Sequence, residues 1–381
     1  MIKPFKVDIS EKLLENIYSK VKNYPWHEMP DDGGWDYGTN LEYMKEISDY
    51  WIKKYNWRET EKKINFFNNF KTNIEGIDIH FIHEKGSGKN SIPILLNHGW
   101  PGSIFEFLNL IDQLTHPEKY GGSIEDSFDV IVPSLPGYGF SGRPPKPIGP
   151  RKISSILNSL MTEKLKYKKY MAQGGDFGGT IATWLAHDYP QNCIAIHINI
   201  LIVRHPDGPQ TIDEKKWEEK FIKDQRIEDG YRTQQATKPQ TLSYAMMDSP
   251  VGVAAWIIEK IRGWSDIKDG NIESIYSKEV LLSNVMIYLV TKTFNTATWI
   301  YYGRRLEGGR YLPVKNLPIQ VPTAIAKFPK EYLEWAPRSY VERIYNIQRW
   351  TEMPKGGHFA ALEQPDLLLK DIQEFSKSLK G

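Results

Sequence analysis

Cysteine is nearly absent from this sequence, since Cys193 is the only one among 381 residues. No disulfide can form within the chain, and no metal cluster can be built on cysteine ligands. Long hydrophobic runs are also missing: no segment approaches the roughly 18 uncharged apolar residues of a membrane-spanning helix, and the first residues, MIKPFKVDIS, lack the apolar stretch of a signal peptide. We therefore expect a soluble, cytoplasmic protein without a membrane anchor.

An excess of charge of either sign is missing as well. The 49 Lys and Arg residues balance 47 Asp and Glu residues, and no basic block could follow a phosphate backbone, so a nucleic acid partner is not expected. Aromatic residues, in contrast, are frequent, with 12 Trp and 21 Tyr. Ordinary packing explains most of them, but such side chains also suit an apolar pocket with hydroxyl and indole donors.

The hydrophobic pattern changes along the chain. Residues 10–22 and 40–55 have helical periodicity, and Ser10 stands where a helix N-cap is expected. From residue 77 onward, short β-rich runs alternate with helical stretches, which predicts an α/β fold with a mostly parallel sheet and crossover helices. The runs are IDIHFIH, IPILLNHG, FDVIVPSL, KYMAQGGD and IAIHINI, and the helical stretches are 104–114, 153–166 and 179–189. Residues 205–310 have no buried strand pattern, whereas 318–327 and 346–353 do, so we predict a helical insertion late in the sheet.

The stretch AQGGDFGGTIAT (172–183) has the glycine spacing of a nucleophile elbow, with Asp176 where a serine is usual. The glycines permit a tight strand-to-helix turn that exposes one side chain at the end of a strand. An aspartate there is already ionised, because its reference pKa is about 3.9. Such a carboxylate is a useful nucleophile toward a saturated carbon that bears a leaving group. The alternative is a glycine-rich turn in which Asp176 caps the next helix.

Two further stretches complete a candidate catalytic set. In LLNHGWPGS (95–103), a loop after an apolar run can direct the Trp100 N–H toward the elbow, where it and the Phe177 N–H would form an oxyanion hole. Without the elbow, this loop would be an ordinary proline turn. In MPKGGHFAALEQPDLLLKDIQEF (353–375), His358 follows two glycines and is the candidate base. Its orienting carboxylate is expected at Glu331, with Glu334 as the weaker rival.

These motifs, taken together and in this order, resemble those of the microsomal-type epoxide hydrolases over nearly the whole chain. The matching stretches are YWIKKYNWRETEKKINFFNNF (50–70), HGWPGS, GGDFGG, YRTQQATKPQTLSYAMMDSPVGVAAWIIEK (231–260) and GGHFAALEQP. The resemblance implies an α/β-hydrolase fold with a mainly helical N-terminal extension over 1–76. It places the core at 77–204 and 313–381, and a helical lid at 205–312.

The resemblance also implies the acid side of the reaction. In this family two lid tyrosines donate hydrogen bonds to the epoxide oxygen, and the matching positions are Tyr231 and Tyr301, with the adjacent Tyr302 as an alternative to Tyr301. The sequence departs from the family pattern at Trp299, where an arginine is frequent, and at Gly303, where an acidic residue is frequent. We therefore expect a repacked lid in this region. Phe177 replaces a frequent tryptophan but keeps the backbone N–H.

The predicted function is hydrolysis of an apolar epoxide to a vicinal diol through an ester on Asp176, without a metal or organic cofactor. One alternative is a hydrolytic dehalogenase with the same nucleophile and base, although Phe177 lacks the indole N–H that suits a halide. Another is a non-hydrolytic relative that binds a ligand in the same pocket. The sequence is compatible with a homodimer, and with detoxification, catabolism or biosynthesis as the biological role.

Overall fold

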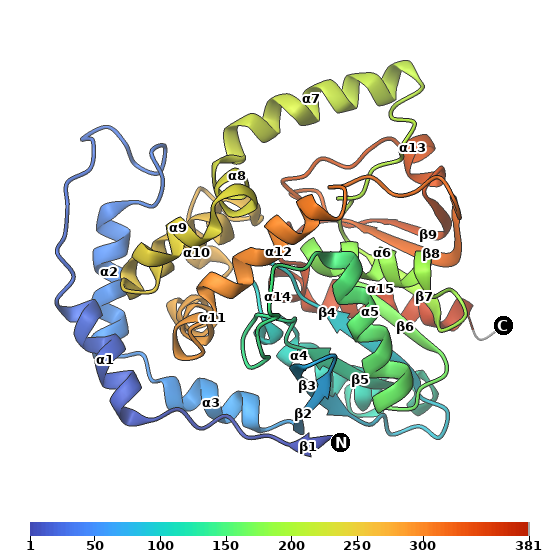
Figure 1. Cartoon of the computed structure of the whole chain (residues 1–381), viewed down its shortest axis with the longest axis horizontal. Coiled ribbons are helices and arrows are strands. Elements are labelled where there is room, and N and C mark those ends of the chain that lie inside the picture. Colours follow the sequence, from blue (N-terminus) through green and yellow to red (C-terminus); the bar gives the residue numbers. More distant parts are fainter. Residues whose placement is uncertain (380–381) are drawn as a thin grey trace.

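The computed structural model describes residues 1–379, and its centre is a nine-stranded sheet. Its strand order is β1-β2-β3-β5-β4-β6-β7-β8-β9 (Figure 1). The strands are β1 (Lys3–Pro4), β2 (Asn69–Ile74), β3 (Ile77–Glu84), β4 (Ile92–Asn97), β5 (Phe128–Pro133), β6 (Tyr170–Gly174), β7 (Cys193–Ile198), β8 (Ile319–Lys327) and β9 (Tyr345–Glu352). From β5 to β9 all neighbours are parallel, which confirms the predicted mostly parallel sheet.

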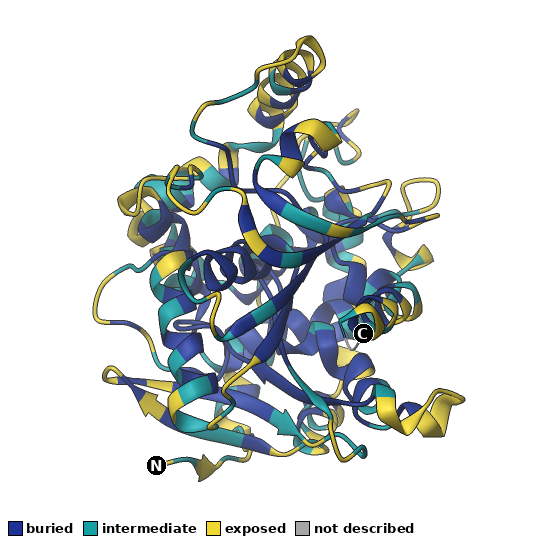
Figure 2. Cartoon of the chain, turned by 90° about the vertical axis from the view of Figure 1, so that its right-hand side faces the viewer, coloured by how far each residue is buried: buried dark blue, intermediate teal, exposed yellow. Residues whose placement is uncertain are grey.

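The central strands are buried over their whole length because both faces of the sheet are covered. All six residues of β5, FDVIVP, and all five of β6, YMAQG, are buried, as expected for parallel strands between helical layers. Figure 2 shows the middle of the sheet as a continuous buried region. Helices α4 (Leu108–Thr115) and α15 (Pro365–Ser378) pack together, as do α5 (Pro150–Ser159) and α6 (Asp176–Asp188).

One edge of the sheet begins earlier than the sequence predicted. Strands β1 and β2 precede residue 77 and pair antiparallel with their neighbours. A two-residue turn, Glu75 and Gly76, joins β2 to β3, and both residues have positive φ, 50° and 82°, as in a type I′ hairpin. The segment NFKTNI was missed because its burial is mixed and its polar content hides the alternation of a strand.

The predicted helical insertion between β7 and β8 is confirmed. It contains α7 (Ile212–Glu228), α8 (Gly230–Thr237), α9 (Pro239–Met246), α10 (Pro250–Trp264), α11 (Lys278–Val290) and α12 (Phe294–Leu306). A capping box at Thr211 and Glu214 starts α7. We call these helices the lid. No helix within residues 1–379 has both the length and the apolar character needed to cross a membrane.

The N-terminal helices pack against the lid, two of them on the side away from the sheet and the third below α11 toward β2 (Figure 1). They are α1 (Glu11–Lys22), α2 (Leu41–Lys53) and α3 (Trp57–Asn65), and they contact α10 and α11. Helix α1 buries Leu14, Ile17 and Val21, as its periodicity predicts, but the Ser10 side chain makes no capping hydrogen bond. Helix α3 was not predicted from the sequence as a separate element. These contacts hold the lid between two layers.

The remaining short elements connect the larger ones. They are α13 (Arg338–Glu342), α14 (Ala360–Glu363), the 3-10 helices η1 (Ile104–Phe107), η2 (Pro117–Tyr120), η3 (Ile124–Asp126) and η5 (Ile272–Ser274), and the π-helical turn η4 (Leu160–Lys164) that extends α5. Helix α6 begins at Asp176, three residues before the predicted start, because the candidate nucleophile itself forms the first turn.

Candidate active site

Asp176 lies at the sharp turn between β6 and α6. Its φ of 46° is in the left-handed region, which costs a non-glycine residue on the order of 1 kcal/mol. The turn also brings α6 close to the end of β4: a Cβ atom at Gly178 would lie 1.8 Å from the carbonyl oxygen of Asn97. Only glycine fits this approach. The spacing of GGDFGG therefore has a geometric cause, and its result is a carboxylate at the carboxyl end of a central strand.

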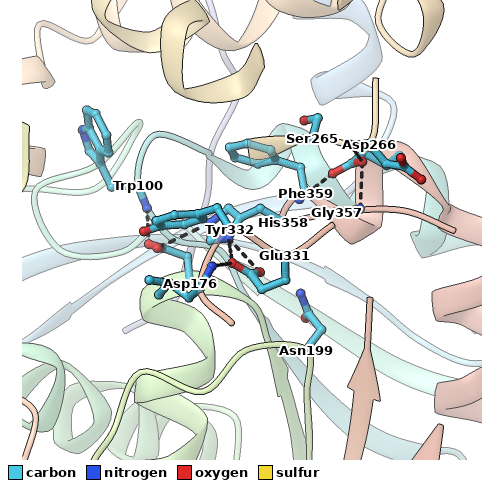
Figure 3. A network of polar contacts seen from close by, with 12 residues as sticks. Trp100, Asp176, Asn199, Ser265, Asp266, Glu331, Tyr332, Gly357, His358 and Phe359 are labelled. Carbon is cyan, nitrogen blue, oxygen red and sulfur yellow. Dashed lines mark hydrogen bonds and ion pairs between the residues drawn. The ribbon is translucent and has the colours of Figure 1, made fainter. Parts of the chain in front are cut away.

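The two carboxylate oxygens of Asp176 have different neighbours. Oδ1 accepts a hydrogen bond from the Trp100 N–H at 2.8 Å, and Oδ2 lies 3.5 Å from Nε2 of His358 (Figure 3). Phe177 follows in the first turn of α6, where the helix itself leaves N–H groups unpaired. The two N–H groups predicted to form the oxyanion hole thus belong to Trp100, in the loop after β4, and to Phe177, the residue after Asp176.

His358 is held from its other side by Glu331. Both Glu331 carboxylate oxygens face Nδ1 of His358, at 2.9 and 3.0 Å, and both side chains are buried. The loop that carries the histidine is tied to the lid, because the His358 N–H donates to the carbonyl oxygen of Trp264 at 2.9 Å. Glu363 adds a second anchor by accepting the N–H groups of Gly357 and Phe359. Nε2 is thereby directed at Asp176.

The two acidic neighbours determine the charge of His358. Burial acts to lower the pKa of its imidazole, but the negative charge of Glu331 and the contact with Asp176 outweigh burial and raise that pKa to about 10. The resting site therefore holds an imidazolium between two carboxylates. Part of this rise depends on the charge of Asp176, so the pKa of His358 falls when that charge is neutralised.

The rival assignments made from the sequence lie elsewhere. The carboxylate of Glu334 is half exposed and pairs with Lys220 at 2.6 Å. Tyr302 is partly exposed, and its ring stacks under the guanidinium of Arg305, 5.5 Å from the ring centre. In the part of the chain that the structure describes, neither of these two side chains contacts Asp176 or His358.

Tyr231 of α8 and Tyr301 of α12 lie together against the loop after β4 that carries Trp100. The Tyr231 ring stacks on Trp100 at 5.2 Å between centres, and the Tyr301 ring meets Phe177 edge to face at 4.8 Å. The hydroxyl of Tyr301 is buried without a hydrogen-bond partner, whereas that of Tyr231 lies 3.2 Å from the Tyr332 hydroxyl. Burial, and after it the charge of Asp176, raise the pKa of Tyr231 to about 12, so it remains a donor.

The departures from the family pattern have local explanations. Trp299 donates its indole N–H to Asn295, one turn earlier on α12, at 3.1 Å. At Gly303, a Cβ atom would lie 2.1 Å from the carbonyl carbon of Ile148, so α12 packs directly on the loop before α5. The next residue, Arg304, places its guanidinium 4.9 Å from the ring centre of Phe177.

Glu106, in η1, is a site residue that the sequence analysis missed. With Asp176, His358 and Gly102 it lines a cavity of about 20 Å³, comparable to the space for one water molecule. Burial raises the pKa of Glu106 to about 8; the charge of His358 opposes this rise and that of Asp176 adds to it. The carboxyl is therefore protonated at neutral pH. Its sequence signal is weak, because a glutamate in the first turn of a helix is usually a surface residue.

Replacing Glu106 with glutamine is expected to remove a pH dependence of stability. A carboxyl with a raised pKa binds more protons in the folded than in the unfolded state, so the free energy of unfolding of the wild type falls as the pH rises from about 4.3 to about 8. Relative to wild type, Glu106→Gln should gain roughly 3–4 kcal/mol between about pH 5 and pH 8, measured by urea unfolding. Glu334→Gln is the control. An equal difference at both pH values would mean that Glu106 is ionised in the folded protein.

Within residues 1–379, no group of three or more His, Cys, Asp and Glu side chains is arranged so that it could hold a metal ion. The polar groups that surround Asp176 come from backbone amides, one imidazole, two other carboxyl groups and the lid tyrosines.

Comparisons with known proteins identify the family and the fold of the chain. The family model described as "Epoxide hydrolase N terminus" matches residues 2–107, and the model of the "alpha/beta hydrolase fold" matches residues 92–214. Juvenile hormone epoxide hydrolase 1 of Ctenocephalides felis is 36% identical over 100% of this chain and 86% of its own length. Epoxide hydrolase 1 of Oryctolagus cuniculus is 35% identical over 98% of this chain and 88% of its own length.

Solved structures show the same fold. The crystal structure of juvenile hormone epoxide hydrolase from the silkworm Bombyx mori has a TM-score of 0.89 and 29% identity, covering 100% of this chain and 96% of that one. The epoxide hydrolase of Aspergillus niger has a TM-score of 0.86 and 29% identity, covering 99% and 96%. The predicted α/β-hydrolase fold is confirmed, and the chain belongs to the epoxide hydrolase family.

Proposed function

We propose that this chain hydrolyses an epoxide to a vicinal diol through a covalent ester on Asp176. The observation that carries the proposal is the position of the Asp176 carboxylate between Nε2 of His358, at 3.5 Å, and the Trp100 N–H, at 2.8 Å. A carboxylate in this position can attack carbon directly, and a base is already in place to hydrolyse the resulting ester.

In the first half of the reaction, Asp176 attacks one carbon of the epoxide from the side opposite to the C–O bond that breaks. Tyr231 and Tyr301 donate hydrogen bonds to the epoxide oxygen, and one of them transfers its proton as the ring opens. Negative charge develops on this oxygen only in the transition state, so donors fixed in advance stabilise the transition state more than the substrate. The products of this half-reaction are a hydroxyalkyl ester and a tyrosinate that is reprotonated before the next turnover.

In the second half, His358 takes a proton from water, and the water oxygen attacks the carbonyl carbon of the Asp176 ester. Ester formation removes the charge of Asp176, which lowers the pKa of His358 and allows the imidazolium to lose its proton. Glu331 orients the imidazole through Nδ1. The N–H groups of Trp100 and Phe177 stabilise the tetrahedral oxyanion, and its collapse releases the diol and restores the carboxylate.

The substrate class that we propose is an apolar epoxide. Four aromatic rings form much of the wall above Asp176, and the centres of contacting rings lie 5.2 to 6.3 Å apart. These rings belong to Trp100, Tyr231, Trp264 and Tyr301. Two relatives carry juvenile hormone in their names, which fits the same class. We also propose a cytoplasmic location and a homodimer. The proposed domain division is an N-terminal extension (1–76), two core segments (77–204 and 313–381) and a lid (205–312).

The proposed function is tested with styrene oxide in H₂¹⁸O under single-turnover conditions. An ester mechanism puts the ¹⁸O into the Asp176 carboxylate in the first turnover, and the diol leaves with an oxygen from the protein. Direct attack of water on the epoxide would instead put the ¹⁸O into the diol and would contradict the proposal. Release of halide from a 1-haloalkane, without diol formation from any epoxide, would favour the dehalogenase alternative.

Tyr231→Phe and Tyr301→Phe are each expected to slow ester formation by about 10²–10³-fold, because each removes one donor to the developing alkoxide. The measurement is the pre-steady-state rate at which the substrate mass appears on the protein. Tyr302→Phe is the matched control, since its ring stacks with Arg305 instead, and it should stay within about twofold of wild type. If Tyr302→Phe were the slower variant, the assignment of the second tyrosine would have to be exchanged.

A further inference from the structure

Another cavity, of about 370 Å³, is lined by residues of α7, α8, the end of α12 and the segment that follows it. Figure 1 shows where these three helices lie. A volume of this size is within the range of small-molecule sites. Five of its lining side chains are arginines, against a single acid, Glu218. We call it the arginine cavity, after Arg204, Arg232, Arg304, Arg305 and Arg310.

The backbone holds two of these arginines beside each other. The Arg204 N–H donates to the Arg310 carbonyl oxygen at 2.8 Å, and the Leu312 N–H donates to the Arg204 carbonyl oxygen at 3.0 Å. The guanidinium of Arg204 lies 4.4 Å from the ring centre of Phe221, and that of Arg310 lies 5.5 Å from the same centre. Two guanidinium groups from distant parts of the sequence therefore lie against the same aromatic ring.

Four of the five guanidinium groups have no carboxylate partner. Arg232 pairs with Asp229, but no ion pair within residues 1–379 includes Arg204, Arg304, Arg305 or Arg310. Arg204 and Arg304 are each only 6% exposed. Nη2 of Arg204 and Nε of Arg310 are buried without any hydrogen-bond partner. Burying a charge is unfavourable unless a counter-charge and hydrogen bonds compensate for it.

The arginines also repel one another. Burial, and after it the positive charges of three other arginines of the cavity, lower the pKa of Arg310 to about 9. At neutral pH the group is still protonated, so the cavity carries a concentrated positive potential. Such a potential raises the local concentration of anions.

We propose that the arginine cavity is an oxyanion-binding site that takes a carboxylate or phosphate group. The guanidinium fork presents paired N–H donors at the spacing of two oxygens of such a group, and the unpaired Nη2 and Nε atoms supply donors without breaking an existing bond. The ligand would neutralise charge that the protein leaves uncompensated. The aromatic and backbone contacts of Arg204 keep its guanidinium in place before the ligand arrives.

Tyr301 connects this site with the candidate active site. It lines the arginine cavity, while its ring contacts Phe177 and Trp100. The oxyanion therefore has two sources that share one chemistry. It is either the acidic end of an otherwise apolar epoxide substrate whose ring lies at Asp176, which rests on the proposed function, or a separate small anion that binds behind Tyr301.

Binding is tested by thermal unfolding of the full chain with inorganic phosphate or acetate at constant ionic strength, with chloride as the replaced ion. Wild type is expected to gain on the order of 3 °C in Tm at saturating anion. Arg310→Gln should lose this gain and, without added anion, should unfold at a higher temperature than wild type because one repulsive charge is removed. Arg338→Gln, an exposed arginine paired with Glu342 outside the cavity, is the control and should keep the full gain.

Three results would overturn the proposal. In the first, wild type gains no stability from either anion. In the second, all three proteins gain stability equally, which would place the anion elsewhere. Lower stability of Arg310→Gln together with an unchanged anion effect would show that Arg310 has a structural role only. None of these measurements requires turnover, so they decide the site even if the proposed function fails.

The source of the oxyanion is decided with a pair of medium-chain terminal epoxides, one ending in a carboxylate and the other in the neutral amide. If the substrate supplies the oxyanion, Arg310→Gln should raise KM for the acid at least about tenfold and leave KM for the amide unchanged. If a separate anion binds, the ratio of the two KM values should stay the same in wild type and variant. Absence of turnover with both compounds would contradict the proposed function alone.

Discussion

Replacing Asp176 with asparagine is expected to lower the steady-state rate of diol formation by at least about 10⁴-fold, which is the size of loss seen when a covalent nucleophile is removed. The amide keeps the shape of the carboxylate and can still accept the Trp100 N–H, but its nitrogen and oxygen carry no net negative charge with which to attack the epoxide carbon. The measurement is diol release from styrene oxide at several enzyme concentrations, combined with the intact mass of the protein after incubation. Neither diol nor a mass increase is expected.

The control for this result is a conservative change of a carboxylate outside the site. Glu334→Gln alters a side chain that pairs with Lys220 on the surface, so it should retain wild-type turnover within about twofold. Circular dichroism and Tm measurements establish that the Asp176 variant is folded. A folded Asp176→Asn protein that forms diol at the wild-type rate would exclude an ester on this residue and would leave only direct attack by water.

Replacing His358 with glutamine is expected to separate the two half-reactions. Asp176 keeps its charge and can still attack, but no base remains to activate water, so the ester should accumulate to about one equivalent while steady-state turnover falls by roughly 10³–10⁴-fold. The reason is geometric: Nε2 is the only imidazole nitrogen on the Asp176 side, because Nδ1 is engaged by Glu331. Mass spectrometry should show the protein plus one substrate, absent from the double variant with Asp176→Asn.

Ester hydrolysis in the wild type should also depend on pH in a defined direction. The pKa of His358 is raised while Asp176 is charged and falls when the ester forms, so the rate of hydrolysis should increase as the pH rises through the lower value. His358→Gln should lose this dependence. An ester that hydrolyses at the wild-type rate in His358→Gln, with the same pH profile, would rule out His358 as the base.

The local parts of the site were predictable from the sequence. Asp176, Trp100 and Phe177 belong to short motifs whose glycines and strand neighbours fix the backbone within a few residues, so the chemistry could be inferred from spacing. His358 and Glu331 required one further assumption, that parallel strands end at the same edge of a sheet, and the hydrogen bonds between them agree with it. The lid tyrosines could be assigned only through the family resemblance, because no local rule relates α8 and α12 to a strand end.

The rest depends on packing that sequence spacing does not determine. Glu106 has the ordinary position of a first-turn glutamate, and only the packing of η1 beside Asp176 and His358 places it at the cavity and raises its pKa. The arginine cavity combines residues that are about 100 positions apart, such as Arg204 and Arg310, through backbone hydrogen bonds between two loops. Strand β2 was missed because its polar residues are tolerated at one edge of the sheet, where one face is partly exposed.

The hydrogen bonds between the lid and the histidine loop have a consequence for inhibition. The His358 N–H donates to the carbonyl oxygen of Trp264 at the end of α10, and the Gly356 N–H donates to the carboxylate of Asp266, two residues beyond that end. A ligand that wedges the end of α10 outward would therefore pull the base away from Asp176 while leaving the elbow, which belongs to the sheet, undisturbed. With such a ligand bound, the epoxide would still alkylate Asp176, but the ester would not be hydrolysed and the diol would not be released. The enzyme would therefore be inactivated by its own substrate.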